Sequence, residues 1–449
     1  MKLPDKIKFA YASGMAGWSI LVNIVGVMLP FFYLPPEGER LSPLLSQVPI
    51  LVVFNLLAII TSAGRLTDAF YDPFIGQQSD RSKNKRGRRI PFMMWSFIPA
   101  VIFCALVFLP PDHFSSSTNA WWLVVTLSLF FVAATSYIIP CNALLPELAQ
   151  TPEERLRLAT LQQVGFVAGI VIASCTNNLA DLVEYLFHID PQNRIHSVQL
   201  AIEILCVIGG IFLFMPVLLI DEKKYCKAQP AHLPLGKAIR ETLKNKNFLL
   251  YAAADFSWYM ALYIITSGLL FYVTVLAGEN KNMGSILMGT MVGASLLFYP
   301  FIVRWTKKLG KKRLVLIAFL ILGGVCASVF GLGRYPIPHK AQLFLFVGLA
   351  AFPLAILGVI PPAILADIAA DDAEKTGENR EGLFFAVKYF VVKLGQTLGI
   401  AVFSMLTLYG KDPGNDYGLR LSGLVVAVLC ILAFAVFSNF KENEKQAEN

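Results

Sequence analysis

The sequence predicts an all-α polytopic membrane protein with twelve transmembrane helices in two halves of six. Of the 449 residues, 56% are hydrophobic and 15% are charged, whereas a typical soluble domain has about 25% charged residues. Apolar stretches that are long enough to cross a bilayer recur along the chain, and a helical span needs about 20 such residues. Two basic segments also stand six predicted spans apart, which indicates an internal repeat.

The predicted spans are helices because a backbone in lipid has to satisfy its hydrogen bonds internally. The first span is too long for the core of a signal peptide and has no small-residue cleavage site after it, so we expect it to be retained. Several stretches exceed the length that a bilayer requires, which permits tilt. The spans lie at residues 8–34, 48–79, 91–110, 120–149, 156–187, 198–220, 246–277, 284–305, 313–333, 341–370, 381–409 and 417–440.

Lysine and arginine are distributed unevenly between the predicted loops. With a cytoplasmic N-terminus, the inside segments hold 28 of the 38 Lys and Arg residues and the outside loops hold 7. The positive-inside rule therefore predicts that both termini are cytoplasmic. The remaining three, Arg65, Lys388 and Lys393, fall inside spans. The net charge of +8 is thus a topology signal, and no nucleic-acid partner is expected.

The two basic segments mark equivalent loops of the two halves. DRSKNKRGRR at 80–89 follows the second span, and RWTKKLGKKR at 304–313 follows the eighth. Parallel repeats of six helices are one of the recurring plans of secondary transporters. We predict an N-terminal six-helix bundle at 1–220, a cytoplasmic linker at 221–246 and a C-terminal six-helix bundle with a short cytoplasmic tail at 247–449.

The linker contains one short segment with a helical pattern. In LGKAIRETL, the apolar residues Leu235, Ile239 and Leu243 recur every four positions. This spacing places them on one face of a helix. We therefore expect a short amphipathic helix in the linker.

The second span carries three ionisable residues on one face. In GRLTDAFYDPFIGQQSDR, Arg65, Asp68 and Asp72 stand at positions i, i+3 and i+7. Ionisable groups inside a span cost a few kcal/mol or more, so they normally face a water-filled pathway. Two carboxylates one turn apart repel each other unless a cation or a proton intervenes. The face therefore predicts a coupling site in which Arg65 pairs with Asp68 after the cation has left. A buried structural salt bridge is the alternative.

The same stretch is similar to the DPxxGxxSDR…GRR signature of the glycoside–pentoside–hexuronide:cation symporter family. Two further motifs carry the resemblance, IIPCNALLPELA at 138–149 and ADIAADDAEKTGENREGLFFAVKYFVVKLG at 366–395. The resemblance runs from the first span to the last. It implies a major facilitator fold and a secondary active transporter, not an enzyme. Such a protein couples a small organic solute (a sugar, glycoside or sugar acid) to Na⁺ or H⁺ by alternating access.

The resemblance also implies a set of cation ligands. The family's site falls on Asp68 and Asp72, with Thr135 as a neutral oxygen ligand of the kind that hard cations prefer. Tyr71 stands where the melibiose carrier of this family has an asparagine, and a phenol is a poorer ligand for sodium. Sodium against proton therefore stays open. Lys393 matches the family's lysine in the eleventh helix, and we expect it to reach toward the two acids. No cofactor other than the coupling ion is implied.

The sugar-binding residues of the melibiose carrier are not retained. Its two aspartates and its arginine correspond to Ser19, Ile138 and Gln163, and Trp18 and Asn142 replace a lysine and a tryptophan. Without the carboxylates that bind sugar hydroxyls, galactosides are not expected. The candidate substrate residues near the middle of the spans are Trp18, Ser19, Asn23, Ile138, Asn142, Gln162, Gln163, Trp258, Tyr259, Tyr263, Tyr389 and Gln396.

These aromatic and amide side chains suit a sugar ring or an amphipathic molecule equally well. The vertebrate lysolipid symporters of the same superfamily branch share the aspartate pair and the lysine, and they also lack the sugar-binding acids. Trp18 and Ile138 fit a lysophospholipid better than a sugar. A non-transporting receptor or scaffold is a third alternative, but it leaves the acid pair unexplained. We expect a monomer in the inner (plasma) membrane, with the lipid bilayer and a small-molecule substrate as its partners.

We expect the remaining charged residues and the paired glycines to have structural roles. Asp255 lies about two turns from the cytoplasmic end of its span, which favours an interfacial position over a second proton site. The glycine pairs at 14 and 17, 165 and 169, and 395 and 399 predict close approach of helices. We expect charged loop residues to form salt bridges between the halves that hold an outward-facing state. They are Asp80, Arg81, Arg88, Arg89, Asp367, Asp371, Glu378, Arg380 and Glu381.

Overall fold

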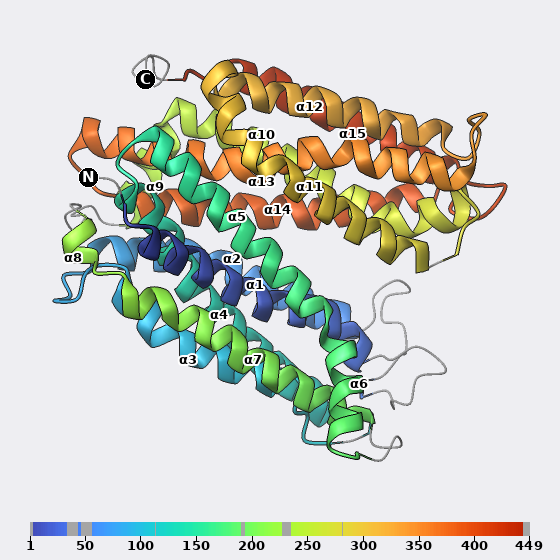
Figure 1. Cartoon of the computed structure of the whole chain (residues 1–449), viewed down its shortest axis with the longest axis horizontal. Helices are drawn as coiled ribbons and strands as arrows, with labels where there is room; N and C mark the ends of the chain where they lie inside the picture. Colours follow the sequence, from blue (N-terminus) through green and yellow to red (C-terminus); the bar gives the residue numbers. More distant parts are fainter. Residues whose placement is uncertain are drawn as a thin grey trace. The chain divides into compact units, whose positions relative to one another are not determined.

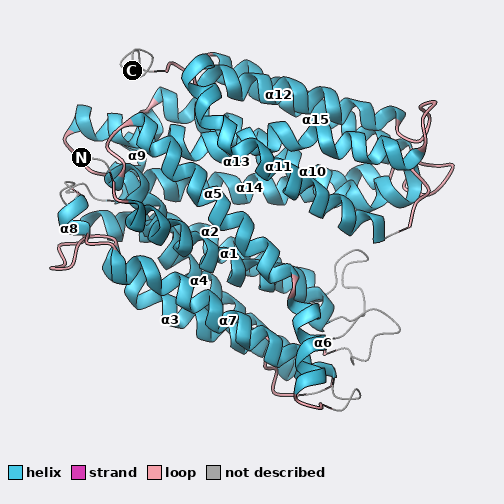
Figure 2. Ribbon diagram, in the orientation of Figure 1, coloured by secondary structure: helices cyan, strands magenta, loops and turns pink. Residues whose placement is uncertain are grey.

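The structure, a computed structural model, consists of helices joined by loops, without strands in the residues that it describes (Figure 1; Figure 2). These residues are 3–33, 44–45, 56–112, 114–189, 194–226, 235–280 and 282–442. Within the helices, the side chains outside the description are those of residues 30–31, 56, 58–59, 62–63, 65–70, 235, 282 and 285.

Seven helices cover the first six predicted spans, because the fifth span is interrupted at Cys175. The Cys175 backbone leaves the helical region, with φ −80° and ψ 4°, and the Thr176 hydroxyl donates to the Ala173 carbonyl at 2.6 Å. Threonine and asparagine, which follow in the sequence, favour such helix ends over helix interiors. The helices are α1 (Asp5–Tyr33), α2 (Leu56–Arg81), α3 (Ile90–Val107), α4 (Ser117–Leu148), α5 (Pro152–Ser174), α6 (Thr176–Leu186) and α7 (Arg194–Leu219).

The second half of the sequence follows the predicted order of spans. The seventh span ends in a π-helical turn over Tyr272–Leu276, and the ninth ends in a 3-10 turn over Ser328–Gly331. The helix of the tenth predicted span, α13, continues to Thr376, six residues beyond the predicted end of that span. The helices are α8 (Glu222–Tyr225), α9 (Leu235–Lys244), α10 (Lys246–Phe271), α11 (Asn282–Leu309), α12 (Lys311–Ala327), α13 (His339–Thr376), α14 (Glu381–Thr407) and α15 (Tyr417–Ser438).

Eleven helices in the described part of the chain are long and apolar enough to cross a membrane. α2 is not in this set, because several of its side chains lie outside the described residues. The number of twelve spans therefore stays a prediction. Large apolar side chains such as Trp121, Val207 and Leu218 are exposed on the helices. Such surfaces need a bilayer to cover them.

The predicted glycine positions are places where helices approach closely. A methyl group on Gly165 would lie 2.2 Å from the Ala12 carbonyl oxygen of α1, and one on Gly17 would lie 2.5 Å from the Gly209 carbonyl of α7. In the other half of the sequence, a methyl group on Gly399 would lie 2.6 Å from the Met260 carbonyl of α10. The small-residue contacts predicted for α1 and α14 are therefore confirmed.

The linker helix α9 forms where the pattern predicts it, but with a different buried face. Ala238 and Thr242 are buried, whereas Leu243 is 43% exposed. Ile239 is half-buried, and the side chain of Leu235 lies outside the described residues. The predicted apolar face is therefore wrong in part, because the helix packs on its small residues.

The chain forms two compact units. In the first, α1 packs against α7, and α4 packs against α2 and α3; in the second, α15 packs against α10 and α12. Each unit includes a segment from the other half of the sequence, so the boundaries predicted at the linker stay a prediction. The first unit is Met1–Gln150, Leu161–Leu235 and Asp372–Ala386, and the second is Thr151–Thr160, Gly236–Asp371 and Val387–Asn449.

Candidate cation site and charged networks

The predicted cation site is on α2 and α4, which pack against each other in the first unit. Asp72 is 0% exposed, and Thr135 is buried as well. An uncompensated buried carboxylate costs several kcal/mol, so Asp72 requires a cation, a proton or hydrogen-bond donors. The side chains of Arg65 and Asp68 lie outside the described residues, and their roles stay predictions.

Tyr71, a predicted neighbour of the cation, is half-buried beside α4. Its hydroxyl oxygen lies 3.4 Å from the hydroxyl oxygen of Ser136, which donates at 2.7 Å to the Val132 carbonyl. The Tyr71 ring packs at 5.9 Å from the ring of Phe74. The Ser136 hydroxyl uses its proton on the backbone and can only accept from Tyr71, and the separation of 3.4 Å makes that contact weak. The role of Tyr71 as a ligand stays a prediction.

A chain of hydrogen bonds connects α1, α5 and α4. The Tyr11 hydroxyl donates to Gln162 at 3.0 Å, and the Gln162 amide donates to the Asn142 side chain at 2.6 Å. Asn142 in turn donates to the Ile138 carbonyl at 2.8 Å. All four side chains are buried, and a buried polar chain of this kind specifies one arrangement of its helices. The structure thus brings together Asn142 and Gln162, two predicted substrate residues.

The other predicted substrate residues of the first unit lie on α1 and α5. The Ser19 hydroxyl donates to the Phe166 carbonyl at 2.6 Å, and Asn23 donates to the Ser19 carbonyl at 2.8 Å. Trp18 is half-buried with its ring centre 6.1 Å from that of Phe166. Its indole N–H is buried and has no hydrogen-bond partner among the described residues. Gln163 is half-buried. Trp18 therefore retains a hydrogen-bond donor, whereas the Ser19 hydroxyl is already used.

The remaining predicted residues belong to the second unit. Trp258 is buried, and its ring centre lies 6.3 Å from that of Tyr259. The other side chains of this set are half-buried, so they retain some access to solvent or ligand. They are Tyr259, Tyr263, Tyr389, Lys393 and Gln396. The predicted approach of Lys393 to the α2 acids stays a prediction.

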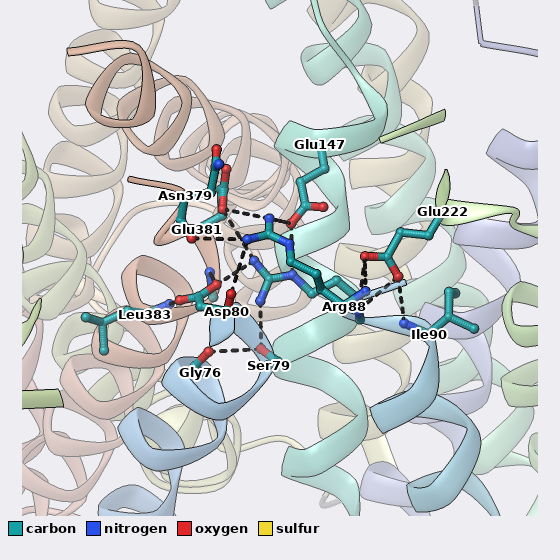
Figure 3. Close-up of polar contacts among 12 residues, drawn as sticks. Gly76, Ser79, Asp80, Arg88, Ile90, Glu147, Glu222, Asn379, Glu381 and Leu383 are labelled. Atoms are coloured by element: carbon teal, nitrogen blue, oxygen red, sulfur yellow. Dashed lines mark hydrogen bonds and ion pairs between the residues drawn. The ribbon is translucent and has the colours of Figure 1, made fainter. Parts of the chain in front are cut away.

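A charged network with the acids Asp80, Glu147 and Glu381 lies at the end of α2 (Figure 3). Arg89 forms ion pairs with all three acids. The Arg89 side chain is 0% exposed. Its Nε donates to Glu147 at 2.8 Å, and its Nη1 donates to the Ser79 hydroxyl at 2.7 Å. Its Nη2 lies 2.5 Å from an oxygen of Asp80 and 3.4 Å from an oxygen of Glu381. Burial alone would lower the pKa of Arg89, but the carboxylates of Asp80, Glu147 and Glu381 together raise it. Arg89 is therefore a permanent cation that three carboxylates share.

Arg88 extends the network to the start of α14. Its Nη2 lies 2.9 Å from Glu147 and 3.4 Å from Glu381, and its Nη1 donates to the Asn379 carbonyl at 3.3 Å. The carboxylate of Asp80 accepts from the backbone N–H groups of Gly382 and Leu383 at 2.9 and 3.0 Å. Asp80 thus caps the N-terminus of α14, where the helix leaves N–H groups unpaired.

Glu222 of α8 caps α3 in the same manner. Its carboxylate accepts from the backbone N–H groups of Arg88, Arg89 and Ile90 at 2.6 to 3.1 Å (Figure 3). Gly87 precedes them with φ 120°, and a methyl group there would lie 2.2 Å from a Glu222 oxygen. Burial, and then the Glu147 carboxylate, raise the pKa of Glu222 although the three N–H groups lower it. The glutamate therefore fixes the loop that carries both arginines.

The second unit contains a related arrangement at the equivalent loop. Gly310 has φ 80°, and the Glu442 carboxylate accepts from the Lys311 N–H at 3.0 Å. The Lys311 ammonium pairs with Asp367 of α13, which also binds Arg155 of α5 at 3.0 Å. A glycine with positive φ, a basic residue and a capping glutamate therefore follow in the same order in both halves. They are Gly87, Arg88 and Glu222 in the first half and Gly310, Lys311 and Glu442 in the second. The two basic loops thus share one pattern of contacts, and their equivalence as parts of an internal repeat stays a prediction.

The expected ion pairs of the loops are found in part. Asp80, Arg88, Arg89, Glu381 and Asp367 form such pairs, whereas Arg81 is exposed. The sequence did not identify several residues that form these ion pairs and caps, because charged side chains near loops usually lie in solvent. Glu147 lies within the motif at 138–149, which was the available signal for it, whereas a glutamate in the basic linker such as Glu222 gives none. One of the unidentified residues, Asp372, binds Arg380 at 2.6 Å. The others are Glu147, Arg155, Glu222, Lys311 and Glu442.

Glu222→Ala is expected to destabilise the protein by about 3 kcal/mol or more, because it leaves three buried backbone donors unpaired at about 1–3 kcal/mol each. Glu442→Ala should have a smaller effect, since Glu442 is half-buried and its shorter contact is with a single N–H. Thermal melting of the purified variants in detergent checks the order, with the exposed Glu374→Ala as the control. Equal melting temperatures for Glu222→Ala and Glu374→Ala would show that the cap is dispensable.

The family model and three relatives that match this chain are all transporters. The family described as "MFS/sugar transport protein" matches residues 10–438. The isoprimeverose transporter of Lactiplantibacillus pentosus is 23% identical, over 92% of this chain and 82% of its own. The glucuronide carrier protein homolog of Escherichia coli is 23% identical over 85% and 83%. The sodium-dependent lysophosphatidylcholine symporter 1-A of Danio rerio is 23% identical over 98% and 86%.

Solved structures of transporters share the fold. The fucose:proton symporter of E. coli superposes with a TM-score of 0.67 at 14% identity, covering 97% of this chain and 98% of its own. A bacterial homologue of the iron transporter ferroportin gives a TM-score of 0.67 at 13% identity, covering 98% and 99%. At 13–14% identity, the likeness concerns the major facilitator fold and leaves the substrate open.

Proposed function

The chain belongs to the glycoside–pentoside–hexuronide:cation symporter family of the major facilitator superfamily, and we propose that its coupling cation binds at Asp68 and Asp72. The protein is a multi-pass membrane transporter and not an enzyme. It couples solute entry to a cation, and Na⁺ or H⁺ is the coupling ion in our proposal. The observation that carries the site is the full burial of the Asp72 carboxylate on α2, a helix that packs against α4, where Thr135 is buried as well.

For the solute, we propose a sugar, a glycoside or a sugar acid. The support is the family and the relatives that carry isoprimeverose and glucuronides. Asn142, Gln162 and the indole N–H of Trp18 supply amide and N–H groups for hydroxyl or carboxylate oxygens. Amide and N–H donors of this kind orient polar ligands in otherwise apolar sites.

A lysophospholipid is the second candidate. The supporting observations are the apolar Trp18 and Ile138 in place of sugar-binding charges and the relative that carries lysophosphatidylcholine. An acyl chain requires apolar surface along its whole length, whereas a sugar ring requires a few directional hydrogen bonds.

A thermal-shift screen of the purified protein separates the two candidates. The ligands are sugars, glycosides, sugar acids and lysophospholipids, each with and without sodium. A ligand that binds only the folded state raises the melting temperature. Stabilisation by a sugar, a glycoside or a sugar acid supports the first candidate, whereas stabilisation by lysophospholipids alone would exclude it. A shift that depends on sodium would identify the coupling ion.

Lys393→Ala is expected to abolish gradient-driven uptake while the protein stays folded in the membrane. The mutation removes the positive charge that we propose as the partner of the α2 acids when the cation has left. Substrate exchange should survive, because exchange needs no return of an empty carrier. Uptake into vesicles and counterflow exchange are the two measurements, with Lys411→Ala in an exposed loop as the control. Normal uptake by Lys393→Ala would make the lysine a packing or snorkelling residue.

Both termini are proposed to be cytoplasmic. A reporter fused after Asn449, or inserted in the 221–246 linker, should read as cytoplasmic, and one in the 35–47 loop should read as external. The reason is the accumulation of Lys and Arg in the proposed inside segments. A periplasmic signal from the C-terminal fusion would contradict both the orientation and the even number of spans.

A further inference from the structure

An acid and a lysine lie buried together in the second unit, away from the sites described above. Asp255 of α10 and Lys388 of α14 are 5% and 7% exposed. Their charged atoms, Oδ2 and Nζ, are 3.9 Å apart. Asp255 lies about 14 Å along α10 from its start at Lys246, at 1.5 Å per residue. Asp255 is buried inside the unit, and the interfacial depth expected from the sequence stays a prediction.

The contact between these two side chains is longer than the other buried ion pairs found among the described residues. Arg380 and Asp372 approach to 2.6 Å, and Arg88 and Glu147 to 2.9 Å, which are hydrogen-bond distances. At 3.9 Å, Lys388 and Asp255 attract each other without sharing a hydrogen bond. An ion pair whose role is structural gains most from direct hydrogen bonds, and this pair lacks them.

Aromatic rings hold the lysine beside the acid. Lys388 Nζ lies 5.2 Å from the ring centre of Tyr259 and 4.8 Å from that of Tyr389. Both distances are within the range of a cation–π interaction, which contributes about 2 kcal/mol when it is desolvated. The ammonium therefore has partners that do not depend on the charge of Asp255.

The carboxylate has an unused position. Among the described residues, no donor forms a hydrogen bond to Asp255 Oδ2. The buried hydroxyl of Tyr251 also has no hydrogen-bond partner among them. Both residues line a cavity of about 10 Å³, close to the space that one water molecule needs. Its other lining residues are apolar and include Trp258, Phe319 and Phe437 of α10, α12 and α15. The titratable groups that interact with Asp255 include Lys388, Tyr251 and Tyr259, and Tyr389 lies against Lys388.

We propose that Asp255 and Lys388 form a proton-binding site in the second unit, separate from the cation site on α2. Ionisable residues inside membrane helices mark ion or substrate pathways by default. A proton from hydronium forms an O–H bond at Asp255 Oδ2 and leaves water behind. The net charge of the pair then changes from zero to plus one, and the cation–π contacts retain Lys388 in place.

This proton supplies a second thermodynamic link between solute movement and the membrane potential. Its exchange with water requires that the helices around α10 open to one side, so the inference rests on the alternating access of the proposed function. Proton binding itself is independent of the substrate and of the α2 acids. The site can therefore be tested on the purified protein alone.

The test is infrared spectroscopy of the full-length protein across a pH series. A protonated carboxyl group has a C=O stretching band that an ionised carboxylate lacks. The wild type should show such a band that titrates with pH, and Asp255→Asn should lose it. Asp412→Asn, in an exposed loop, should retain it. Asp68→Asn and Asp72→Asn should also retain it, which separates this site from the proposed cation site.

A double variant covers the case in which Asp255→Asn leaves Lys388 unpaired and unfolds the protein. Asp255→Asn with Lys388→Met removes both charges, which usually restores folding of a broken buried pair. The folded double variant should lack the same band. The proposal is overturned if the double variant has the wild-type band, or if the wild type shows no titrating band that depends on Asp255. The pair would then be a structural ion pair.

Discussion

Asp68→Asn and Asp72→Asn are each expected to eliminate accumulation of substrate against its gradient. Each substitution removes one ligand and one negative charge from the proposed site, so the remaining carboxylate should no longer hold a cation or a proton at working concentrations. Asp72→Asn should be at least as severe, because the carboxylate is fully buried and Pro73 fixes the backbone beside it. Uptake into energised vesicles is the measurement, with Asp412→Asn as the control.

The same variants provide a test of cation binding without transport. If sodium is the coupling ion, it should raise the melting temperature of the wild type, and either variant should lose that rise. If the ion is a proton, sodium should have no effect on any of the proteins, and uptake should follow the pH gradient. Normal accumulation by both variants under either gradient would mean that the acid pair is structural.

Arg89→Ala is expected to destabilise the protein by about 3–5 kcal/mol, the usual result of removing one partner from a buried charge network. Three carboxylates, of Asp80, Glu147 and Glu381, would lose their shared cation. Arg89→Lys should recover only part of the stability, because lysine cannot donate through the planar fork that binds several acids at once. Thermal melting and yield of folded protein in detergent measure both effects.

Arg86→Ala is the matched control for Arg89. Arg86 is in the same loop and is exposed, and its side chain contacts Met94. Its removal should change the melting temperature little, since substitutions at exposed sites without such partners are usually within about 0.5 kcal/mol. A loss of stability as large for Arg86→Ala as for Arg89→Ala would contradict the assignment of the network to Arg89.

Hydropathy was sufficient to predict the order and type of the long helices, because each span has to satisfy its backbone hydrogen bonds within itself. It did not predict the break at Cys175, which depends on one local hydroxyl contact. Nor did it predict the π-helical turn over Tyr272–Leu276, where the Tyr272 hydroxyl bonds Ser422 of α15 at 2.6 Å. Neither a single local contact nor a contact between helices leaves a periodic signal in the sequence.

The candidate sites were predictable to different extents. Asp72 was identifiable because a carboxylate in an apolar span is rare and costly, and its burial agrees with that reasoning. Glu222 was not identifiable, because a glutamate in a basic linker resembles any solvated charge. Its function as a cap depends on where α8 meets α3. Lys388 was recognised as intramembrane, but its acid partner Asp255 is 133 residues away in sequence, and only the fold brings them together.

The most direct test of the account is accumulation of solute in vesicles with sodium and proton gradients imposed separately. The solute is the ligand that stabilises the protein in the thermal-shift screen. The account predicts accumulation above the external concentration under at least one gradient, and its loss when an ionophore collapses that gradient. Equilibration of the solute without accumulation, at a rate that neither gradient changes, would contradict cation-coupled symport.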